Sequence, residues 1–210
     1  TYERIAAGLM DHGDGTYTYT FSQDLDAYNG VTYEPSLTHR LCIQSSGGTW
    51  NAVNYVIDFV PDQLPSLVAI LPNTRDVVTT AACNECHTEL LNIHGTRYET
   101  KYCVACHNPG LGDGDMTLMT HAIHAGDFRE TAYELGGDDF SHVVFPQDLM
   151  DCAKCHQGMD GDNWMTQPNM VSCGSCHDTV DFGSHFGGQT DNSNCAGCHA
   201  DPAHRAPHHR

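Results

Sequence analysis

Five copies of the pattern Cys-x-x-Cys-His constrain this chain more than any other feature. They use ten of its 11 cysteines. Two thiols separated by two residues can both form thioethers along one edge of a haem, and the next imidazole then ligates the iron. The pattern therefore predicts five covalently bound c-type haems. The attachment residues are Cys83, Cys86 and His87; Cys103, Cys106 and His107; Cys152, Cys155 and His156; Cys173, Cys176 and His177; and Cys195, Cys198 and His199.

Zinc is the main alternative to haem, because the first two motifs have the spacing of a zinc ribbon. The histidines argue against it. Histidine makes up 15 of 210 residues, yet it follows all five Cys-x-x-Cys units, which random placement would almost never produce. A ribbon needs no histidine there, and five half-sites cannot pair evenly into four-cysteine sites. A thioredoxin-like redox motif would not be repeated five times either.

Ten histidines remain as candidates for the second axial ligand of each iron. A second imidazole makes the iron six-coordinate, whereas an open position would favour ligand chemistry. We expect distal ligands at His94, His121, His124 and His185. His121 and His124 are three residues apart, so one helical turn between residues 117 and 124 can serve two haems. For the fifth place we favour His204 over His142, and leave both open.

The character of the chain changes near residue 80. Before it, the sequence predicts a turn at residues 11–15. It also predicts strands at residues 16–21, where side-chain types alternate, and at residues 41–43 and 53–60. After it, little periodicity is left, and porphyrins would have to serve as the core. We therefore expect a small β-rich domain at residues 1–78, barrel-like or sandwich-like, which is either incomplete or completed by the haem domain or a neighbouring chain. A mostly irregular pentahaem domain with few short helices follows at residues 79–210. Cys42 has no partner left and is expected to be a buried free thiol.

The charge balance limits the partners. The chain has 27 acidic against 9 basic side chains and a formal charge of -18. Nucleic acid is not an expected partner, because phosphate binding needs a basic surface. Basic proteins, cations and positively charged mineral surfaces suit an acidic protein better. No apolar run reaches the about 20 residues that would cross a bilayer as a helix.

Several ordered stretches give the region from residue 75 to residue 199 a resemblance to a known family. It resembles the pentahaem domains of the OmcA/MtrC family of outer-membrane decahaem cytochromes, and residues 1–74 resemble the end of the β-barrel domain that precedes such a domain. The stretches are Arg75-Asp76-Val77-Val78-Thr79-Thr80, Leu91-Asn92-Ile93-His94-Gly95, Tyr102-Cys103-Val104-Ala105-Cys106-His107-Asn108-Pro109, His121-Ala122-Ile123-His124-Ala125-Gly126, Phe145-Pro146-Gln147-Asp148-Leu149 and His185-Phe186-Gly187-Gly188-Gln189.

The resemblance implies bis-histidine haems that are closely stacked, with His94, His121, His124 and His185 among the ligands. It also implies a place on the outer-membrane surface or outside the cell, with the periplasm as the alternative. Members of the family receive electrons from other multihaem cytochromes through a porin–cytochrome conduit. They pass them to iron or manganese minerals, flavins or other acceptors. The family usually has two such halves, so this chain is either half of a longer protein or a small relative.

Three functions compete at this stage. The first is electron transfer to an extracellular acceptor. The second is a homopolymeric filament in which haems continue from one subunit to the next. The third is a multihaem reductase, which would need at least one iron with an open position. The chain has enough histidines to give each of the five irons a second imidazole ligand, so we expect an electron-transfer protein and not an enzyme.

Overall fold

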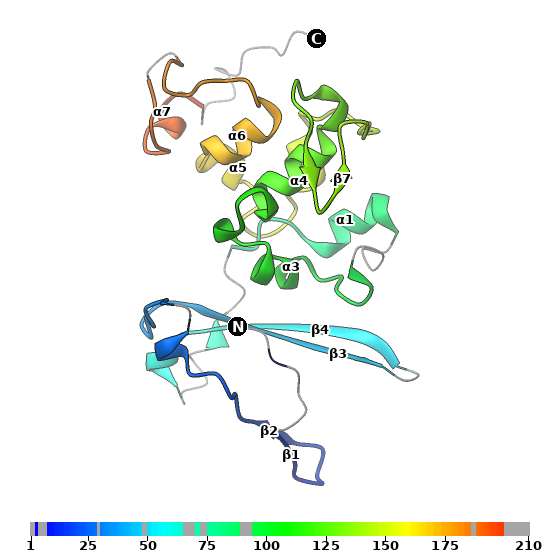
Figure 1. Cartoon of the computed structure of the whole chain (residues 1–210), viewed down its shortest axis with the longest axis vertical. Helices are drawn as coiled ribbons and strands as arrows, with labels where there is room; N and C mark the ends of the chain where they lie inside the picture. Colours follow the sequence, from blue (N-terminus) through cyan, green and yellow to red (C-terminus); the bar gives the residue numbers. More distant parts are fainter. Residues whose placement is uncertain are drawn as a thin grey trace. The chain divides into compact units, whose positions relative to one another are not determined.

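The computed structural model describes residues 3, 8–28, 30–47, 50–64, 70–71, 75–88, 94–185 and 188–199 (Figure 1). The chain forms two compact units. Unit 1 consists of Thr1–His39 and Phe59–Ile70, and unit 2 consists of Arg40–Asp58 and Leu71–Arg210. All five motifs therefore belong to unit 2, together with the segment from residue 40 to residue 58.

Unit 1 is built on a short antiparallel hairpin. Strands β1 (Leu9–Asp11) and β2 (Tyr17–Tyr19) pair with Leu9 opposite Tyr19. Gly13 and Gly15 turn the chain between them with φ of 77° and 89°, values that suit glycine. The predicted turn and the predicted strand that follows it are confirmed. Among its described residues, unit 1 also contains two 3-10 helices: η1 (Leu25–Ala27) and η2 (Pro61–Gln63).

A three-stranded sheet with the order β3-β4-β5 lies between residues 39 and 71. Its strands are β3 (His39–Gly47), β4 (Trp50–Phe59) and β5 (Ile70–Leu71). The strands predicted at 41–43 and 53–60 are confirmed, and β3 is longer than expected. Exposure alternates along the first part of β4, where residues 51, 53 and 55 are exposed and residues 52, 54 and 56 are half-buried. One face of this strand is therefore available to pack against the rest of unit 2.

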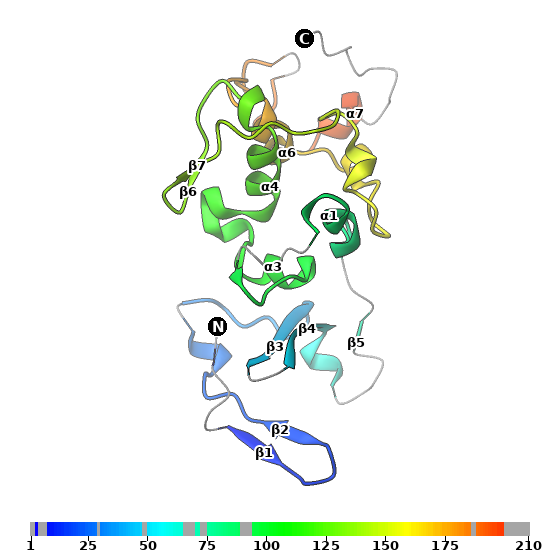
Figure 2. The same ribbon diagram turned by 90° about the vertical axis from the view of Figure 1, so that its right-hand side faces the viewer.

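In the described residues, the remainder of unit 2 consists of short helices, one short antiparallel strand pair and irregular chain (Figure 2). Helix α4 includes the helix predicted at 117–124, and it packs against α6. The elements are α1 (Thr80–His87), α3 (Thr100–Cys106), η4 (Pro109–Gly114), α4 (Met116–His124), η5 (Gly126–Phe128), β6 (Glu134–Leu135), β7 (Asp138–Asp139), η6 (Cys152–Lys154), α5 (Asn163–Thr166), α6 (Met170–Cys176) and α7 (Cys195–His199).

Polar side chains start several of these helices. Thr79 caps α1 by accepting a hydrogen bond from the backbone of Ala82 at 3.1 Å. Asp115 caps α4 by accepting from Thr117 at 2.7 Å and Leu118 at 3.3 Å. Asn169 caps α6 in the same manner. Such caps satisfy amides that the helix leaves unpaired, so they fix where each short helix begins.

Unit 2 buries few apolar side chains. Among the described residues, its buried apolar side chains are three alanines and two tyrosines: Ala82, Tyr102, Ala122, Ala125 and Tyr133. Cys42 is free and half-buried rather than fully buried. Within the described part of the chain, no helix has the length and apolar character needed to cross a membrane. The fold thus agrees with the predicted mostly irregular domain preceded by a small β-rich region.

Candidate haem-binding centres

The motifs lie at the ends of short helical segments. The first motif ends α1, and the second, fourth and fifth fall on α3, α6 and α7, while the third lies on η6. A helical turn brings the two cysteines of a motif onto neighbouring positions and places the histidine at the end of the segment. All eleven cysteines lie in the described part of the chain, and none is in a disulfide. No motif cysteine is therefore consumed by a disulfide.

Within the described residues, four of the motif histidines face a second histidine ring. In each pair the partner is one of the four histidines that the sequence suggested as distal ligands. The ring centroids are 5.8 Å apart for His87 and His124, 5.9 Å for His107 and His94, 6.1 Å for His156 and His121, and 5.9 Å for His199 and His185.

These separations fit an iron between the two rings. Metal–imidazole bonds are about 2 Å long, and each ring centroid lies behind its ligating nitrogen, which puts the two centroids roughly 6 Å apart. Zinc would instead bring about four ligands together. In the described residues, no group of three or more His, Cys, Asp or Glu side chains converges in that way. The donor set therefore fits haem iron held between paired imidazoles.

Backbone carbonyls orient several of these rings. The Nδ1 atom of His107 donates to the carbonyl of Gly114 at 2.7 Å, and those of His121 and His124 donate to carbonyls one turn earlier on α4 at 2.8 and 2.7 Å. A proton on Nδ1 leaves the lone pair on Nε2. The hydrogen bonds therefore select the tautomer that can ligate a metal through Nε2.

Burial favours the neutral form of three of the paired rings. It lowers the pKa of His121 below its usual value, and the neighbouring His156 lowers it further. Burial also lowers the pKa of His156, and for His87 burial and the adjacent His124 act in the same direction. A neutral imidazole is the form that binds a metal. The environment of these rings therefore favours ligation at neutral pH.

Helix α4 joins the first and third motifs. Its His124 faces the histidine of the first motif and its His121 that of the third. A further link, which the sequence analysis missed, is an ion pair between Glu85, inside the first motif, and Lys154, inside the third. The sequence does show opposite charges at the x positions of these two Cys-x-x-Cys-His motifs. Nothing in the sequence shows that the two motifs are neighbours, so the ion pair could not be predicted.

The second motif lines a cavity with its candidate distal ligand. Cys103, Cys106, His107 and His94 share this cavity with Arg97 and Tyr102. A complete attachment set is thus gathered in one place: two thiols, a proximal ring and a distal ring. Arg97 adds a cation that the sequence analysis did not single out.

The fourth motif is anchored by an arginine that was also missed. The guanidinium of Arg129 donates to the carbonyl of Ser175, inside the motif, and lies 3.6 Å from the carboxylate of Asp178. Asp178 in turn accepts from the backbone of Glu130 and Thr131. These contacts tie the segment after α4 to the chain around His177. No local sequence pattern marks them, because the partners are more than 40 residues apart.

The fifth distal position keeps its two candidates. His204 lies outside the described residues. His142 is exposed, and in the described part of the chain its ring contacts no other histidine ring. His12 and His39 make contacts of their own in unit 1, where His39 packs against Tyr33 and Phe59.

Five attachment motifs and imidazoles paired at iron-spanning distances define the class of this protein: it is a multihaem c-type cytochrome. A family model described as "Outer membrane cytochrome MtrC/MtrF-like, domains II/IV" matches residues 75–210. The chain belongs to this family, as the ordered sequence stretches had suggested.

Two comparisons extend beyond the motif region. The chain is 34% identical over 207 residues to the "Multiheme cytochrome MtrC" of Shewanella baltica strain OS185, covering 91% of this chain and 29% of that protein. It is also similar to the crystal structure of MtrC from the same organism, with a TM-score of 0.72 and 31% identity over 91% of this chain and 31% of that one. The chain thus spans less than a third of the length of these relatives, and the likeness includes the β-rich region.

Proposed function

We propose that the chain holds five c-type haems, each between two imidazoles, and passes electrons along them to acceptors outside the cell. The observation that carries this proposal is the set of four histidine pairs at 5.8 to 6.1 Å. Each pair joins one motif histidine to one histidine from elsewhere in the chain. A site closed on both sides suits electron transfer better than substrate chemistry.

The protein's part in this function is to bind and orient. When bound, each haem supplies a one-electron centre whose potential depends on its axial ligands, burial and surroundings. The chain contributes thioether attachment, neutral rings and carbonyls that fix the tautomer. Short helices with polar caps hold these groups in place, since an ordinary apolar core is small. Rigid ligation on both sides limits rearrangement during electron exchange.

Neighbouring centres support a conducting function. Two histidines on one turn of α4 face the histidines of the first and third motifs. The Glu85–Lys154 ion pair holds these two motifs next to each other. Two haems attached there would lie next to each other. Because electron tunnelling weakens steeply with distance, this close spacing favours transfer between them.

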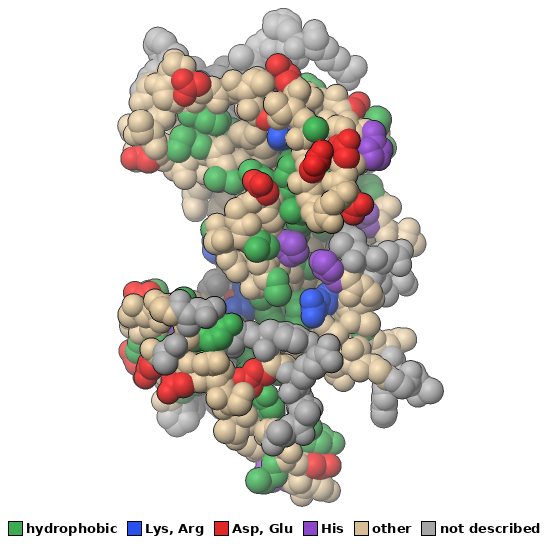
Figure 3. Space-filling model, in the orientation of Figure 1, with side chains coloured by type: hydrophobic (Ala, Val, Ile, Leu, Met, Phe, Trp, Pro, Cys, Tyr) green, Lys and Arg blue, Asp and Glu red, His purple; other side chains and the backbone are tan. Residues whose placement is uncertain are grey.

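The relatives support a proposal for the location and partners of this chain. The matching family is described as outer-membrane cytochromes, and the named relative is a multihaem cytochrome. We therefore place this chain at the outer-membrane surface or outside the cell, with other multihaem cytochromes or a porin–cytochrome conduit as donors. Iron or manganese minerals and flavins are the acceptors. Acidic side chains on the face in Figure 3 suit a positively charged mineral.

The first experiment is to count the haems and record their spin state. Pyridine haemochrome analysis should give five c-haems per chain, and EPR and visible spectra of the oxidised protein should be fully low-spin. Rapid oxidation of the reduced protein by a flavin or a ferric chelate should follow. Fewer haems, or a high-spin fraction that binds nitrite in the unmodified protein, would refute this proposal and favour a reductase.

The second experiment tests the ligand pairs. His124→Ala should convert about one fifth of the haem to a high-spin form that binds cyanide, because each proposed pair holds one of five irons. The count of haems should not change. His12→Ala is the matched control, since His12 is exposed in unit 1 and bonds to Thr18. Low-spin spectra in both variants would rule out His124 as a ligand.

The fifth ligand can be assigned in the same way. We propose His204, which follows the last motif closely, over His142, which is exposed and whose ring contacts no other histidine ring in the described residues. His204→Ala should create a high-spin haem and His142→Ala should not. The reverse result assigns His142 instead.

A further inference from the structure

The segment from His94 to Lys101 connects the candidate distal ligand of the second haem to the helix that carries its attachment cysteines. It begins with a tight turn, in which Gly95 has φ of 69° and the amide of Thr96 donates to the carbonyl of His94 at 2.7 Å. It ends in α3. Whatever fixes this segment therefore fixes both sides of one haem centre.

Asn54 of strand β4 holds the middle of the segment. Its side-chain amide donates to the carbonyl of Thr96 at 2.9 Å, and its carbonyl oxygen accepts from the backbone of Tyr98 at 2.8 Å and Glu99 at 3.3 Å. One side chain thus satisfies three backbone groups. The hydroxyl of Tyr98 adds a bond to the carbonyl of Ala52 at 3.1 Å.

Gln44 of strand β3 holds the segment and the side chain of Arg97. Its amide nitrogen donates to the hydroxyl of Thr96 at 2.6 Å, and its oxygen accepts from Nε of Arg97 at 3.0 Å. A bond at Nε fixes the plane of the guanidinium. Arg97 lines the cavity that contains His94, His107 and both cysteines of the second motif.

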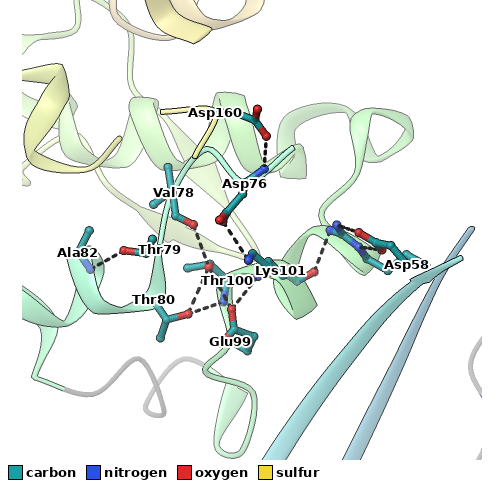
Figure 4. A network of polar contacts seen from close by, with 11 residues as sticks. Asp58, Asp76, Val78, Thr79, Thr80, Ala82, Glu99, Thr100, Lys101 and Asp160 are labelled. Atoms are coloured by element: carbon teal, nitrogen blue, oxygen red, sulfur yellow. Dashed lines mark hydrogen bonds and ion pairs between the residues drawn. The ribbon is translucent and has the colours of Figure 1, made fainter. Parts of the chain in front are cut away.

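Arg40, also on β3, supports the start of α3. It donates to the carbonyl of Lys101 at 3.3 Å and forms a two-pronged pair with Asp58 of β4 at 2.8 Å for each prong (Figure 4). The Asp58 side chain is 1% exposed. All these residues belong to unit 2. The β3–β4 hairpin is therefore bonded to the segment at its beginning, its middle and its end.

We propose that the β3–β4 hairpin is a working part of the second haem centre. Gln44 and Asn54 act as positioning residues, and through them Arg97 is kept beside the haem bound at Cys103 and Cys106. The oxidised haem carries one more positive charge than the reduced form. A fixed cation nearby disfavours oxidation, so this arrangement raises the reduction potential of that one centre. The inference rests on the proposed function, because it needs a haem at the second motif.

The test uses the mature, haem-loaded chain and follows its visible spectrum during a potentiometric titration. Arg97→Gln should move about one fifth of the absorbance change to lower potential, since one of five motifs is affected. We expect a change of roughly tenfold in the oxidation equilibrium, which is about 59 mV for a one-electron couple. Arg97→Lys should restore most of the wild-type potential because it keeps the charge.

Variants of the hairpin separate positioning from general stability. Gln44→Ala should shift the same component in the same direction by less than Arg97→Gln. Asn54→Ala should also shift it and raise the high-spin fraction, because the segment that carries His94 loses three bonds. Asn51→Ala is the matched control: it removes the same side chain from the exposed face of β4 and should leave the titration unchanged.

The two levels of the proposal fail in different ways. If the unmodified protein lacks five low-spin haems, the proposed function is wrong. If it has them but Arg97→Gln, Gln44→Ala and Asn54→Ala all titrate like the wild type, only the role of the hairpin is overturned. An equal shift in Asn51→Ala would overturn it too, because the effect would then not depend on these contacts. A shift in Arg97→Lys as large as that in Arg97→Gln would exclude the charge as its cause.

Discussion

Among the described residues, neither unit 1 nor unit 2 buries many apolar side chains, and polar contacts are arranged differently in the two units. In unit 1, the carboxylate of Glu3 accepts hydrogen bonds from the hydroxyl of Tyr19 at 2.7 Å and from the backbone of Ser22 and Gln23 at 3.0 and 2.7 Å. In unit 2, the polar contacts converge on the haem-attachment segments. The contacts in unit 1 stabilise a small β-hairpin. The contacts in unit 2 position the segments that would hold the haems.

The comparison shows that hydrogen bonds and ion pairs have a different function in each unit: in unit 1 they stabilise the fold itself, and in unit 2 they position segments around cofactor sites. Buried polar groups stabilise a fold only when their partners are well placed, and each bond contributes little by itself. Unit 1 can depend on such bonds because it is small. Unit 2 is much larger and buries only alanines and tyrosines as apolar side chains among its described residues. Its stability should therefore depend on haem, whereas that of unit 1 should not.

The largest expected effect comes from preventing haem attachment altogether. Expression without the cytochrome c maturation machinery should remove the stability of unit 2, typically about 5–15 kcal/mol for a folded domain. The reason is that its side chains bury too little apolar surface to offset chain entropy. Hydrogen exchange measured by mass spectrometry should show unit 2 exchanging rapidly in the haem-free chain. Protection in that chain equal to that of the haem-loaded protein would break the comparison.

The buried ion pair of the hairpin gives the next largest effect. Asp58→Ala leaves Arg40 half-buried without its carboxylate partner, which typically costs about 3–5 kcal/mol. Denaturant unfolding of the haem-loaded protein, followed in the haem absorbance, should register this loss in unit 2. Asp62→Ala is a suitable control, because Asp62 is an exposed residue of unit 1. Equal midpoints for the two variants would contradict the role assigned to the pair.

Much of this architecture is visible in the sequence. The motifs are local patterns, and hairpins and single helices depend on neighbouring residues, so the strands β2, β3 and β4 and the helix α4 were predicted. The spacing of His121 and His124 correctly suggested that both lie on one helical turn. The attachment residues themselves and the role of each distal histidine stay predictions that the spectra will test.

Pairings between distant residues could not be predicted. His94 follows the first motif in the chain, yet it lies opposite His107 of the second. This choice depends on how helices and the hairpin pack, which has no local signature. The composition changes near residue 80, but residues 40–58 belong with the motifs by their contacts. The domain boundary between residues 78 and 79 stays a prediction. The hydrogen-bond partners of Gln44 and Asn54 lie 42 to 53 residues away in the chain, so no local pattern predicts them.

Close approaches of the backbone were equally hidden. A Cβ atom at Gly158, two residues after the third motif, would clash with the carbonyl of Asp76. The amide of Gly158 instead donates to the carbonyl of Val77 at 3.1 Å. The glycine is needed because the chain from the third motif runs directly against the segment before α1. Sequence alone shows a glycine there but not what it approaches.

A smaller effect should follow from removing a helix cap in unit 2. Asp115→Ala deletes the bonds to Thr117 and Leu118 at the start of α4, at a typical cost of about 1 kcal/mol. Because α4 carries His121 and His124, fraying should also raise the high-spin fraction at high temperature. Asp113→Ala, two residues earlier and exposed, should do neither. Thermal unfolding monitored by visible spectra compares the two, and identical curves would show that the cap does not matter.

The smallest effect belongs to unit 1 and depends on pH. Hydrogen bonds from Tyr19, Ser22 and Gln23 lower the pKa of Glu3 to about 2, from an ordinary 4.5. A lowered pKa stabilises the folded state above the unfolded value. That contribution should be complete above about pH 4.5 and should disappear as the pH falls through about 2.

The amide NMR signals of Ser22 and Gln23 report this change directly, because both amides donate to the Glu3 carboxylate. Their shifts should titrate with a midpoint near 2. Glu3→Gln should abolish the titration, while Glu34→Gln, at an exposed position of the same unit, should leave it intact. A midpoint near 4.5 would mean that the carboxylate is not held as described. The hairpin of unit 1 would then need another explanation for its order, and the contrast with the haem-dependent unit 2 would weaken.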